Sequence, residues 1–550
     1  MTSKLGEEFT ACQPLLYLYS GAGNLPSPDM PSLESPSTIL ILILVASLYV
    51  LVSRTRRRGL PLPPGPPQLP LLGNIFDVPS TSQWETYAQW SKKYNSDIIY
   101  LNLAGTSVIV LSSLEATDAL LEKRSSIYSD RQTGSDDGER AHGVGFQHRS
   151  DEIWYGDDWR TGRRLFNKAL NIQVSHNYKP HEVVGSRMLL KRLLHAPEDF
   201  LAHFRQMAGE IIMSVAYGIN VLPSDDPYIA LAHKAVHTFS IASVPGLYLV
   251  DTFPILKHIP RWLPGAGFKR QAEKWRKLAR GMLETPFDET KRQVEAGRAR
   301  PSFTANSLQA LKDSESELYF QERHVQAAAG TMYIGGADTT VSALGTFVLA
   351  MLANPEAQKK AQEEIDFVTG GKYLPTFNDE AAMPYVSALV NEVMRWENVV
   401  PAALPHLLMT EDEYRGYRLP AGSIVIGNTW AILHDEVMYP DPYVFKPERF
   451  LLNGKPNPAV KTPEVAFGFG RRLCPGRHLA LSSIWITVAS ILATFDITKA
   501  VDEEGNIIEP SHDYISGLIC TPAPFKCSIT PRSQDAVALI EAAVSDDLPL

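Results

Sequence analysis

The chain has 550 residues, 44% of them hydrophobic, which is enough apolar material for a large globular core. Its formal net charge of −9, without any long basic stretch, argues against nucleic acid as a partner. The four cysteines, Cys12, Cys474, Cys520 and Cys527, are too few and too scattered for a disulfide framework, and no CxxC pair suggests structural zinc. The main body is therefore expected to face a reducing compartment.

The first recognisable element is an apolar run at residues 38–53, followed at once by the arginine cluster of "SRTRRRG". A helix of about 15 residues reaches about 22 Å, which suits a thin membrane when the flanking residues lie at the interfaces. The arginines favour a single transmembrane anchor over a signal peptide or a buried core helix, and they place the following residues in the cytoplasm. Residues 1–37 then form a luminal leader and residues 54–74 a basic, proline-rich hinge. The expected location is the endoplasmic reticulum membrane.

The main body, residues 75–530, is predicted to be mainly α with small β-sheets. Residues 97–113 contain two β-rich runs around Ala104-Gly105-Thr106, which predicts a hairpin. Strand character returns at residues 417–433, and the partly acidic residues 531–550 are expected to form a loose C-terminal tail. Helix-period apolar positions recur in three long stretches: 327–352, 355–367 and 382–396.

The stretch "FGFGRRLCPG", residues 467–476, sets one cysteine in a loop rich in glycine and arginine. Gly470 and Gly476 allow the backbone to fold tightly against a flat ligand. A metal ion would deprotonate the Cys474 thiol, and the planar fork of Arg472 suits a carboxylate. Haem, with its iron and propionates, combines both features. The alternative is a buried structural cysteine.

Two polar pairs and a later arginine form the next patterns. Trp159 and Arg163 are spaced i, i+4 on one helix face, although an amphipathic helix with a basic outer face has the same pattern. Glu392 and Arg395 are spaced i, i+3, so they can pair, and Arg449 follows in "PERF". Alone, such pairs are more often surface contacts.

The stretch "YIGGADTTVSA" places glycines and polar residues inside an apolar helical segment. A glycine in a helix costs about 1 kcal/mol relative to alanine, so Gly335 and Gly336 require a reason, such as a small ligand against the backbone. The Thr339 hydroxyl can bond the carbonyl four residues earlier and loosen the helix, and Asp338 can pass protons. The alternative is an Asp-Thr-Thr helix cap.

Together these motifs resemble the cytochrome P450 superfamily over roughly residues 63–530, and in particular its membrane-bound fungal members of secondary metabolism. The resemblance implies the P450 fold behind one transmembrane helix, with haem b ligated by Cys474. Asp338 and Thr339 would supply protons, and Glu392, Arg395 and Arg449 would form a buried structural triad. The implied haem contacts are Trp159, Arg163, His406, Phe467, Gly470, Arg472 and Gly476.

The implied activity is a monooxygenase that inserts one oxygen atom of O2 into an organic molecule. Electrons would come from NADPH through a separate membrane-bound reductase, because the chain has no Gly-x-Gly-x-x-Gly loop and no room for a flavin domain. One alternative is a haem-thiolate isomerase or dehydratase, which Asp338 and Thr339 disfavour. The other is a non-catalytic haem-binding sensor or carrier.

A substrate pocket is predicted on the helix of Gly335 and, by the resemblance, on two later apolar segments. None of its side chains is charged, and burying an unpaired ionised substrate group would cost several kcal/mol. The predicted substrate is therefore hydrophobic, terpenoid or polyketide-like, although ordinary core residues have the same apolar pattern. The predicted lining residues are Ala328, Met332, Gly335, Val399, Val400, Ala402, Leu518 and Ile519.

Overall fold

The computed structural model describes residues 59–131, 156–242, 250, 256, 258–312 and 318–545. The chain divides into two units, Met1–Pro61 and Leu62–Leu550, and the second contains all the elements described below. The predicted leader (1–37) and transmembrane anchor (38–53) lie outside the described residues and stay predictions.

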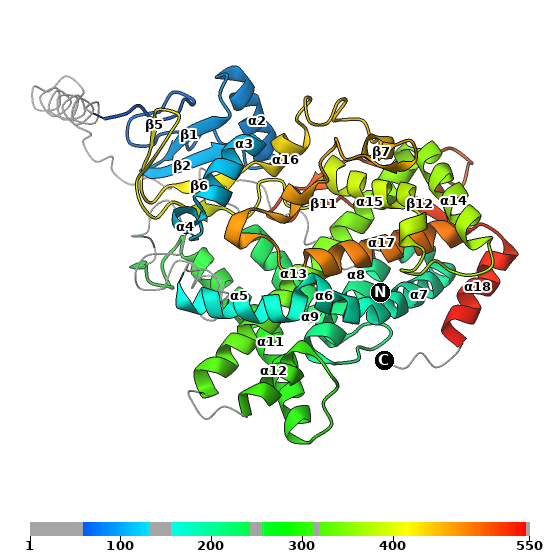
Figure 1. Cartoon of the computed structure of the whole chain (residues 1–550). Helices are drawn as coiled ribbons and strands as arrows, with labels where there is room; N and C mark the ends of the chain where they lie inside the picture. The colour runs from blue at the N-terminus through cyan, green and yellow to red at the C-terminus, as the bar shows by residue number, and fades with distance from the viewer. Residues whose placement is uncertain are drawn as a thin grey trace, which may run out of the picture. The chain divides into compact units, whose positions relative to one another are not determined.

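Helices form most of the second unit, as the sequence predicts (Figure 1). The longest is α13 (Leu318–Ala353), which packs most extensively against α8 (Phe200–Tyr217) and also contacts α5 (Asp157–Leu170) and α17 (Arg477–Thr494). The other long helices are α2 (Gln83–Lys93), α7 (Lys179–His195), α9 (Pro227–Ala242), α11 (Gly267–Glu295), α12 (Phe303–Lys312), α14 (Pro355–Thr369), α15 (Pro384–Trp396) and α18 (Gln534–Ser545). Short α-helical turns are α3 (Leu114–Thr117), α4 (Ser125–Tyr128), α6 (Ile172–Ser175) and α16 (Thr429–Leu433).

The predicted hairpin is β1 (Ile98–Leu103) with β2 (Thr106–Leu111), joined at Ala104-Gly105, where both residues have positive φ. β2 pairs in parallel with β6 (Ile424–Gly427), and β6 pairs with β3 (His406–Leu407), which gives the sheet order β1-β2-β6-β3. The two-stranded sheets are β4 (Asp412–Tyr414) with β5 (Tyr417–Leu419), β7 (Leu451–Leu452) with β8 (Lys455–Pro456), β9 (Phe495–Lys499) with β12 (Cys527–Pro531), and β10 (Tyr514–Ile515) with β11 (Thr521–Pro522).

Both faces of the four-stranded sheet are buried. Ile98 and Tyr100 belong to one apolar cluster, whereas Ile99 and Leu101 between them belong to another, as the alternation of side chains along a strand requires. The largest cluster lies among the helices and includes Phe347 of α13. The unit therefore has a helical core with a smaller sheet-centred core beside it.

Two expectations from the sequence need correction. The predicted strand region, residues 417–433, ends in a helix, α16. Asn428 caps this helix, because its side-chain oxygen accepts from the Ala431 amide at 3.1 Å. In the later part of the proline-rich hinge, the Pro64 carbonyl accepts from the Tyr100 amide of β1 at 2.9 Å. The supposedly loose tail contains α18, whose Ile540 is fully buried.

Two helices among the described residues, Gln321–Ala353 within α13 and Arg477–Thr494, are long and apolar enough to cross a membrane. Both are mostly buried inside the fold. Core helices satisfy the same length and composition test, so these two give only weak evidence for membrane insertion.

Candidate functional site

The cysteine loop lies between a 3-10 turn, η8 (Glu464–Phe467), and the start of α17. The Cys474 amide donates to the Phe467 carbonyl at 2.9 Å, which closes the loop. Gly470 has φ 56°, and a Cβ there would lie 2.1 Å from the Leu121 carbonyl oxygen. Gly470 is therefore required by an approach of protein backbone rather than by a flat ligand, whereas a Cβ at Gly476 would meet nothing within 4 Å.

The surroundings of the Cys474 sulfur act on its pKa in opposite directions. Burial raises the pKa of this thiol, while a hydrogen bond from the Gly476 amide and the charges of Arg163 and Arg477 lower it. Burial prevails, so the thiol is protonated unless a further cation lies against the sulfur. A metal ion is the kind of group that would make the thiolate stable here.

A cluster of basic side chains includes the predicted His406 and Arg472. The Arg472 guanidinium lies 5.0 Å from the Trp159 ring centroid, and its Nε donates to the Ser129 carbonyl at 2.7 Å. His406 Nδ1 lies 2.7 Å from the Tyr128 carbonyl oxygen. The structure thus brings together Trp159, His406 and Arg472, which are far apart in the sequence.

Arg131 belongs to the same cluster and was not predicted. Its guanidinium donates to the carbonyls of Leu404 and Pro405, just before His406. Burial, and then the charge of Arg472, lower the pKa of Arg131 to about 9. Burial, Arg131 and Arg472 also lower the pKa of His406. Because these basic groups oppose one another's protonation, an anionic ligand with carboxylates would relieve their repulsion.

The "GGADTT" stretch lies in the middle of α13, so the helix-cap alternative is wrong. The Thr339 hydroxyl donates to the Gly335 carbonyl at 2.5 Å, the i−4 bond that the sequence predicts. Gly335 is exposed, and a Cβ on it would meet nothing within 4 Å. A Cβ on Gly336 would lie 3.0 Å from two Ile212 side-chain carbons of α8. Only Gly335 therefore adjoins open space; Gly336 serves helix packing.

Asp338 points away from that open face toward α8 and α9. Its Oδ1 lies 3.7 Å from Arg205 Nε and 3.7 Å from His233 Nδ1. Neither basic residue belongs to a motif in the sequence, and neither was predicted. Asp338 thus lies one residue from Thr339 along the helix but faces different neighbours.

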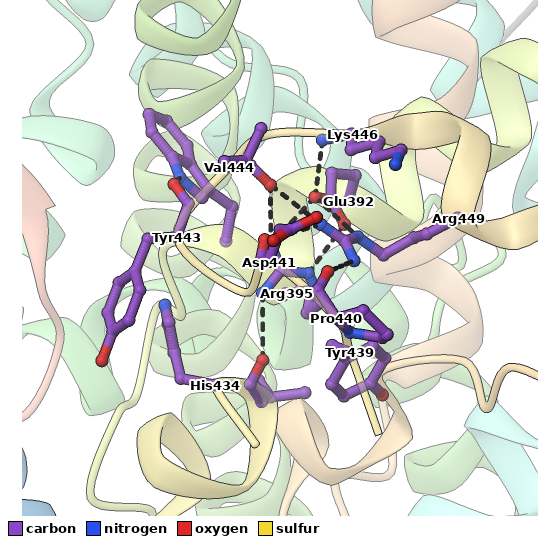
Figure 2. Close-up of polar contacts among 12 residues, drawn as sticks. Glu392, Arg395, His434, Tyr439, Pro440, Asp441, Tyr443, Val444, Lys446 and Arg449 are labelled. Carbon is purple, nitrogen blue, oxygen red and sulfur yellow. Dashed lines mark hydrogen bonds and ion pairs between the residues drawn. The ribbon is translucent and has the colours of Figure 1, made fainter. Parts of the chain in front are cut away.

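The predicted triad is present and buried (Figure 2). Arg395 donates from Nε and Nη2 to the two Glu392 carboxylate oxygens at 2.7 and 2.8 Å, and Arg449 Nε lies 3.1 Å from both. The remaining guanidinium donors bind backbone carbonyls, including Leu433 for Arg395 and Pro440 for Arg449. These bonds join α15 to the segment before β7, so the surface-contact alternative is wrong.

The predicted pocket residues fall into different environments. Ala328 and Met332 are sealed inside the helical core, so they pack against protein atoms. Gly335 is exposed, while Val399 is buried and hydrogen-bonded through its carbonyl to the Cys520 amide at 2.9 Å. The remaining residues, all partly buried, are Val400, Ala402, Leu518 and Ile519.

Comparison with known proteins now identifies the family. Residues 63–529 match the family model described as Cytochrome P450. The chain belongs to the cytochrome P450 family. It is a P450 monooxygenase, and the relatives it matches are fungal monooxygenases.

Three of these relatives cover almost the whole P450. Cytochrome P450 monooxygenase 98 of Postia placenta is 46% identical over 507 residues, 91% of this chain and 96% of the relative. Cytochrome P450 monooxygenase ple1 of Rhodocybe pseudopiperita is 45% identical over 487 residues, 88% and 91% of the two chains. Tryptamine 4-monooxygenase of Psilocybe cyanescens is 40% identical over 502 residues, 90% and 98% of the two chains.

Family membership implies a haem bound through a cysteine thiolate, dioxygen as co-substrate and a reductase as electron donor. The residues of this P450 fit such a group. Cys474 is a thiol that needs a cation to ionise, and Arg131, His406 and Arg472 are basic groups that an anionic ligand would stabilise. The site therefore has a donor for the iron and partners for the propionates.

Proposed function

We propose that this P450 binds haem b and inserts one oxygen atom of dioxygen into a neutral, hydrophobic small molecule of fungal secondary metabolism. Cys474 would ligate the iron, and Trp159, His406, Arg472 and Arg131 would surround the propionates. Bound haem supplies the activation of dioxygen. The observation that carries the proposal is the exposed Gly335 near Thr339, because it leaves open space in the middle of a mostly buried helix.

The side chains of α13 would divide the work beside that space. Gly335 leaves room for a small ligand and for part of the substrate. The Thr339 hydroxyl donates to the Gly335 carbonyl, so its lone pairs can accept a hydrogen bond from a water or ligand beside it, and rotation of the hydroxyl would let it donate to that ligand instead. Asp338, one residue earlier, can hold a proton on its carboxylate and pass it on through water. Both protons that the reaction consumes would follow this route.

The substrate proposal rests on the absence of charge among the candidate lining residues. Val399, Val400, Leu518 and Ile519 are apolar and at least partly buried. The name of one relative records tryptamine as its substrate. The ammonium group of tryptamine would be left unpaired against such side chains, at a cost of several kcal/mol. We therefore favour a terpenoid or polyketide-like substrate over an amine.

Electron supply and location complete the proposal. NADPH would deliver electrons through a separate reductase, since the sequence contains no dinucleotide-binding glycine loop. The apolar run at residues 38–53 and its arginine flank favour a single-pass protein of the endoplasmic reticulum, with its catalytic unit in the cytoplasm.

The test uses the full chain, expressed in membranes with a fungal NADPH reductase. Wild type should give the thiolate-type carbon monoxide difference band and convert a panel of fungal terpenoids and polyketides with NADPH and oxygen consumed. Cys474→Ser should lose the band, whereas the matched controls Cys520→Ser and Cys527→Ser should keep it. A persistent band in Cys474→Ser would refute the haem assignment. Conversion of tryptamine, with none of the neutral compounds, would refute the substrate class.

A further inference from the structure

Three helices place one acid and two bases together outside the haem contacts described above. Asp338 of α13 lies between Arg205 of α8 and His233 of α9, with both nitrogens 3.7 Å from the same carboxylate oxygen. The side chains are 13%, 31% and 42% exposed, respectively. The carboxylate is therefore nearly enclosed, whereas the histidine extends toward the surface. We call these three residues the Asp338 cluster.

The contacts in the Asp338 cluster are ion pairs without hydrogen bonds. Asp338 Oδ1, Arg205 Nε and His233 Nδ1 are each buried and make no hydrogen bond in the described part of the chain. Leaving such a group unsatisfied costs about 1–3 kcal/mol. A separation of 3.7 Å exceeds hydrogen-bond length, so the missing bond requires a small movement of the side chains, toward one another or around a water. The cluster is thus built to rearrange.

His233 has the chemistry to connect this enclosed carboxylate with solvent. Imidazole is the side chain that ordinarily gains and loses protons near neutral pH. Its Nδ1 faces Asp338, and the ring is partly exposed. The next turn of α9 carries His237, whose ring centroid lies 6.5 Å from that of His233. Burial and then His233 lower the pKa of His237, while Asp338 raises it.

We propose that His233 passes protons from solvent to Asp338, and that Arg205 positions the carboxylate that receives them. Solvent protonates Nε2 of the neutral Nδ1–H imidazole, and the Nδ1 proton then moves through a bridging water to Asp338 Oδ1. The ring is left as the neutral Nε2–H tautomer, which loses its Nε2 proton to solvent and gains one at Nδ1 by tautomerisation or ring rotation before the next transfer. No electron moves in this step. The Arg205 side chain, 3.7 Å away, holds the Asp338 carboxylate in place. The inference rests on the proposed role of Asp338 as the proton donor of the oxygenation.

The competing explanation is a structural ion pair that only ties α9 to α13. The two explanations differ for His233→Gln, because glutamine can still donate a hydrogen bond to Asp338 but cannot carry a proton. A structural role predicts that this variant behaves like wild type. A proton-passing role predicts a defect that depends on proton delivery.

The first measurement uses the full chain with reductase in membranes, in H2O and in D2O. For His233→Gln we expect product formed per NADPH to fall by about tenfold, with hydrogen peroxide replacing product and a larger solvent isotope effect. In an Asp338→Asn background, His233→Gln should cause no further fall in product formed per NADPH. His203→Gln is the matched control: it is a histidine of α8 whose Nε2 lies 2.8 Å from the Ala196 carbonyl oxygen, and it should resemble wild type. Unchanged product yield and isotope effect in His233→Gln would overturn the proposal.

The second measurement does not depend on turnover. In histidine-labelled protein in the ferrous carbon monoxide form, the His233 imidazole resonance should titrate at a different pH in Asp338→Asn than in wild type, whereas the His203 resonance should not. An unchanged His233 titration would show that the two groups are not coupled and would refute the proton path. If the titration shifts but wild type forms no oxygenated product, the coupling stands and the proposed function fails.

Discussion

Two groups of charged residues in this P450 combine the same kinds of charge but differ in their contact distances and in their exposure to solvent. The triad of Glu392, Arg395 and Arg449 and the Asp338 cluster each hold one carboxylate between two basic side chains. In the triad, the contacts to the carboxylate are 2.7–3.1 Å and the exposed fractions are 0–5%. In the Asp338 cluster, the contacts are 3.7 Å, and exposure rises to 42% at His233.

The difference shows which charges hold the fold and which are free to move. Every carboxylate oxygen of the triad accepts hydrogen bonds, and the Lys446 amide adds another at 2.7 Å. Such a network fixes its members, because removing any partner leaves a buried charge uncompensated. The Asp338 cluster has no hydrogen bond to lose among its three facing atoms. The triad is therefore suited to a structural role, and the cluster to one that needs exchange with solvent.

The largest expected effect comes from opening the triad. Glu392→Gln leaves two buried guanidinium groups without their counter-charge, so we expect a loss of about 3–5 kcal/mol in the free energy of unfolding. Urea unfolding followed by tryptophan fluorescence measures it. The control is Glu411→Gln, which breaks the exposed 2.7 Å pair with Arg418 and should cost less than about 1 kcal/mol. Equal losses in the two variants would contradict the structural role of the triad.

The contrast also explains how much the sequence could predict. The triad, the Cys474 loop and the Asp338-Thr339 pair were found because their residues form local motifs, even though their partners are distant. Helix and hairpin positions followed from apolar periodicity. The apolar Ala536 and Ile540, spaced i, i+4 and both buried, are the sequence signal for α18.

The remaining site residues depend on how distant segments pack. No sequence motif contains Arg205, His233 or Arg131. They reach their partners only because the elements that carry them, α8, α9 and the segment after α4, pack against distant parts of the chain. The sequence pattern of Gly336 is that of a ligand-binding glycine, but a Cβ there would meet the Ile212 side chain. Side-chain direction between packed helices is a tertiary property that one sequence does not state.

A third buried carboxyl is hydrogen-bonded less completely than the triad and more than the Asp338 cluster. Its substitution gives the second largest expected effect. Glu182 of α7 is fully buried; its Oε1 accepts from the Ser482 hydroxyl at 2.9 Å, but its Oε2 has no hydrogen-bond partner in the described part of the chain. Burial raises its pKa to about 8, although the Ser482 bond and Lys179 act in the opposite direction. The neutral acid is therefore the form that the fold favours.

The sign of the resulting pH dependence follows from this pKa. Below about pH 4.5 both folded and unfolded states are protonated, and as pH rises toward 8 the unfolded state ionises first, so stability falls. Glu182→Gln removes this loss of stability. We therefore expect the difference in unfolding free energy between the variant and wild type to be about 2–3 kcal/mol more favourable to the variant at pH 7.5 than at pH 5. Glu356→Gln, at an exposed position of α14, is the control and should show no such difference. Parallel stability curves for wild type and Glu182→Gln would contradict the raised pKa.

The smallest expected effect separates the two glycines beside the Asp338 cluster, where one substitution meets dense packing and the other meets open space. Gly335→Ala should raise the free energy of unfolding by about 1 kcal/mol, because alanine favours the helix and its methyl group touches nothing. Gly336→Ala should lower it by about 1 kcal/mol, since a Cβ 3.0 Å from the Ile212 side chain strains the contact by more than the helix gains. Binding of azoles of increasing size, followed by the haem spectrum, should weaken for the larger ones in Gly335→Ala alone. Because the two changes are chemically identical, equal shifts in stability and azole binding would show that both glycines face the same environment, and the open space at Gly335 would no longer support a ligand site there.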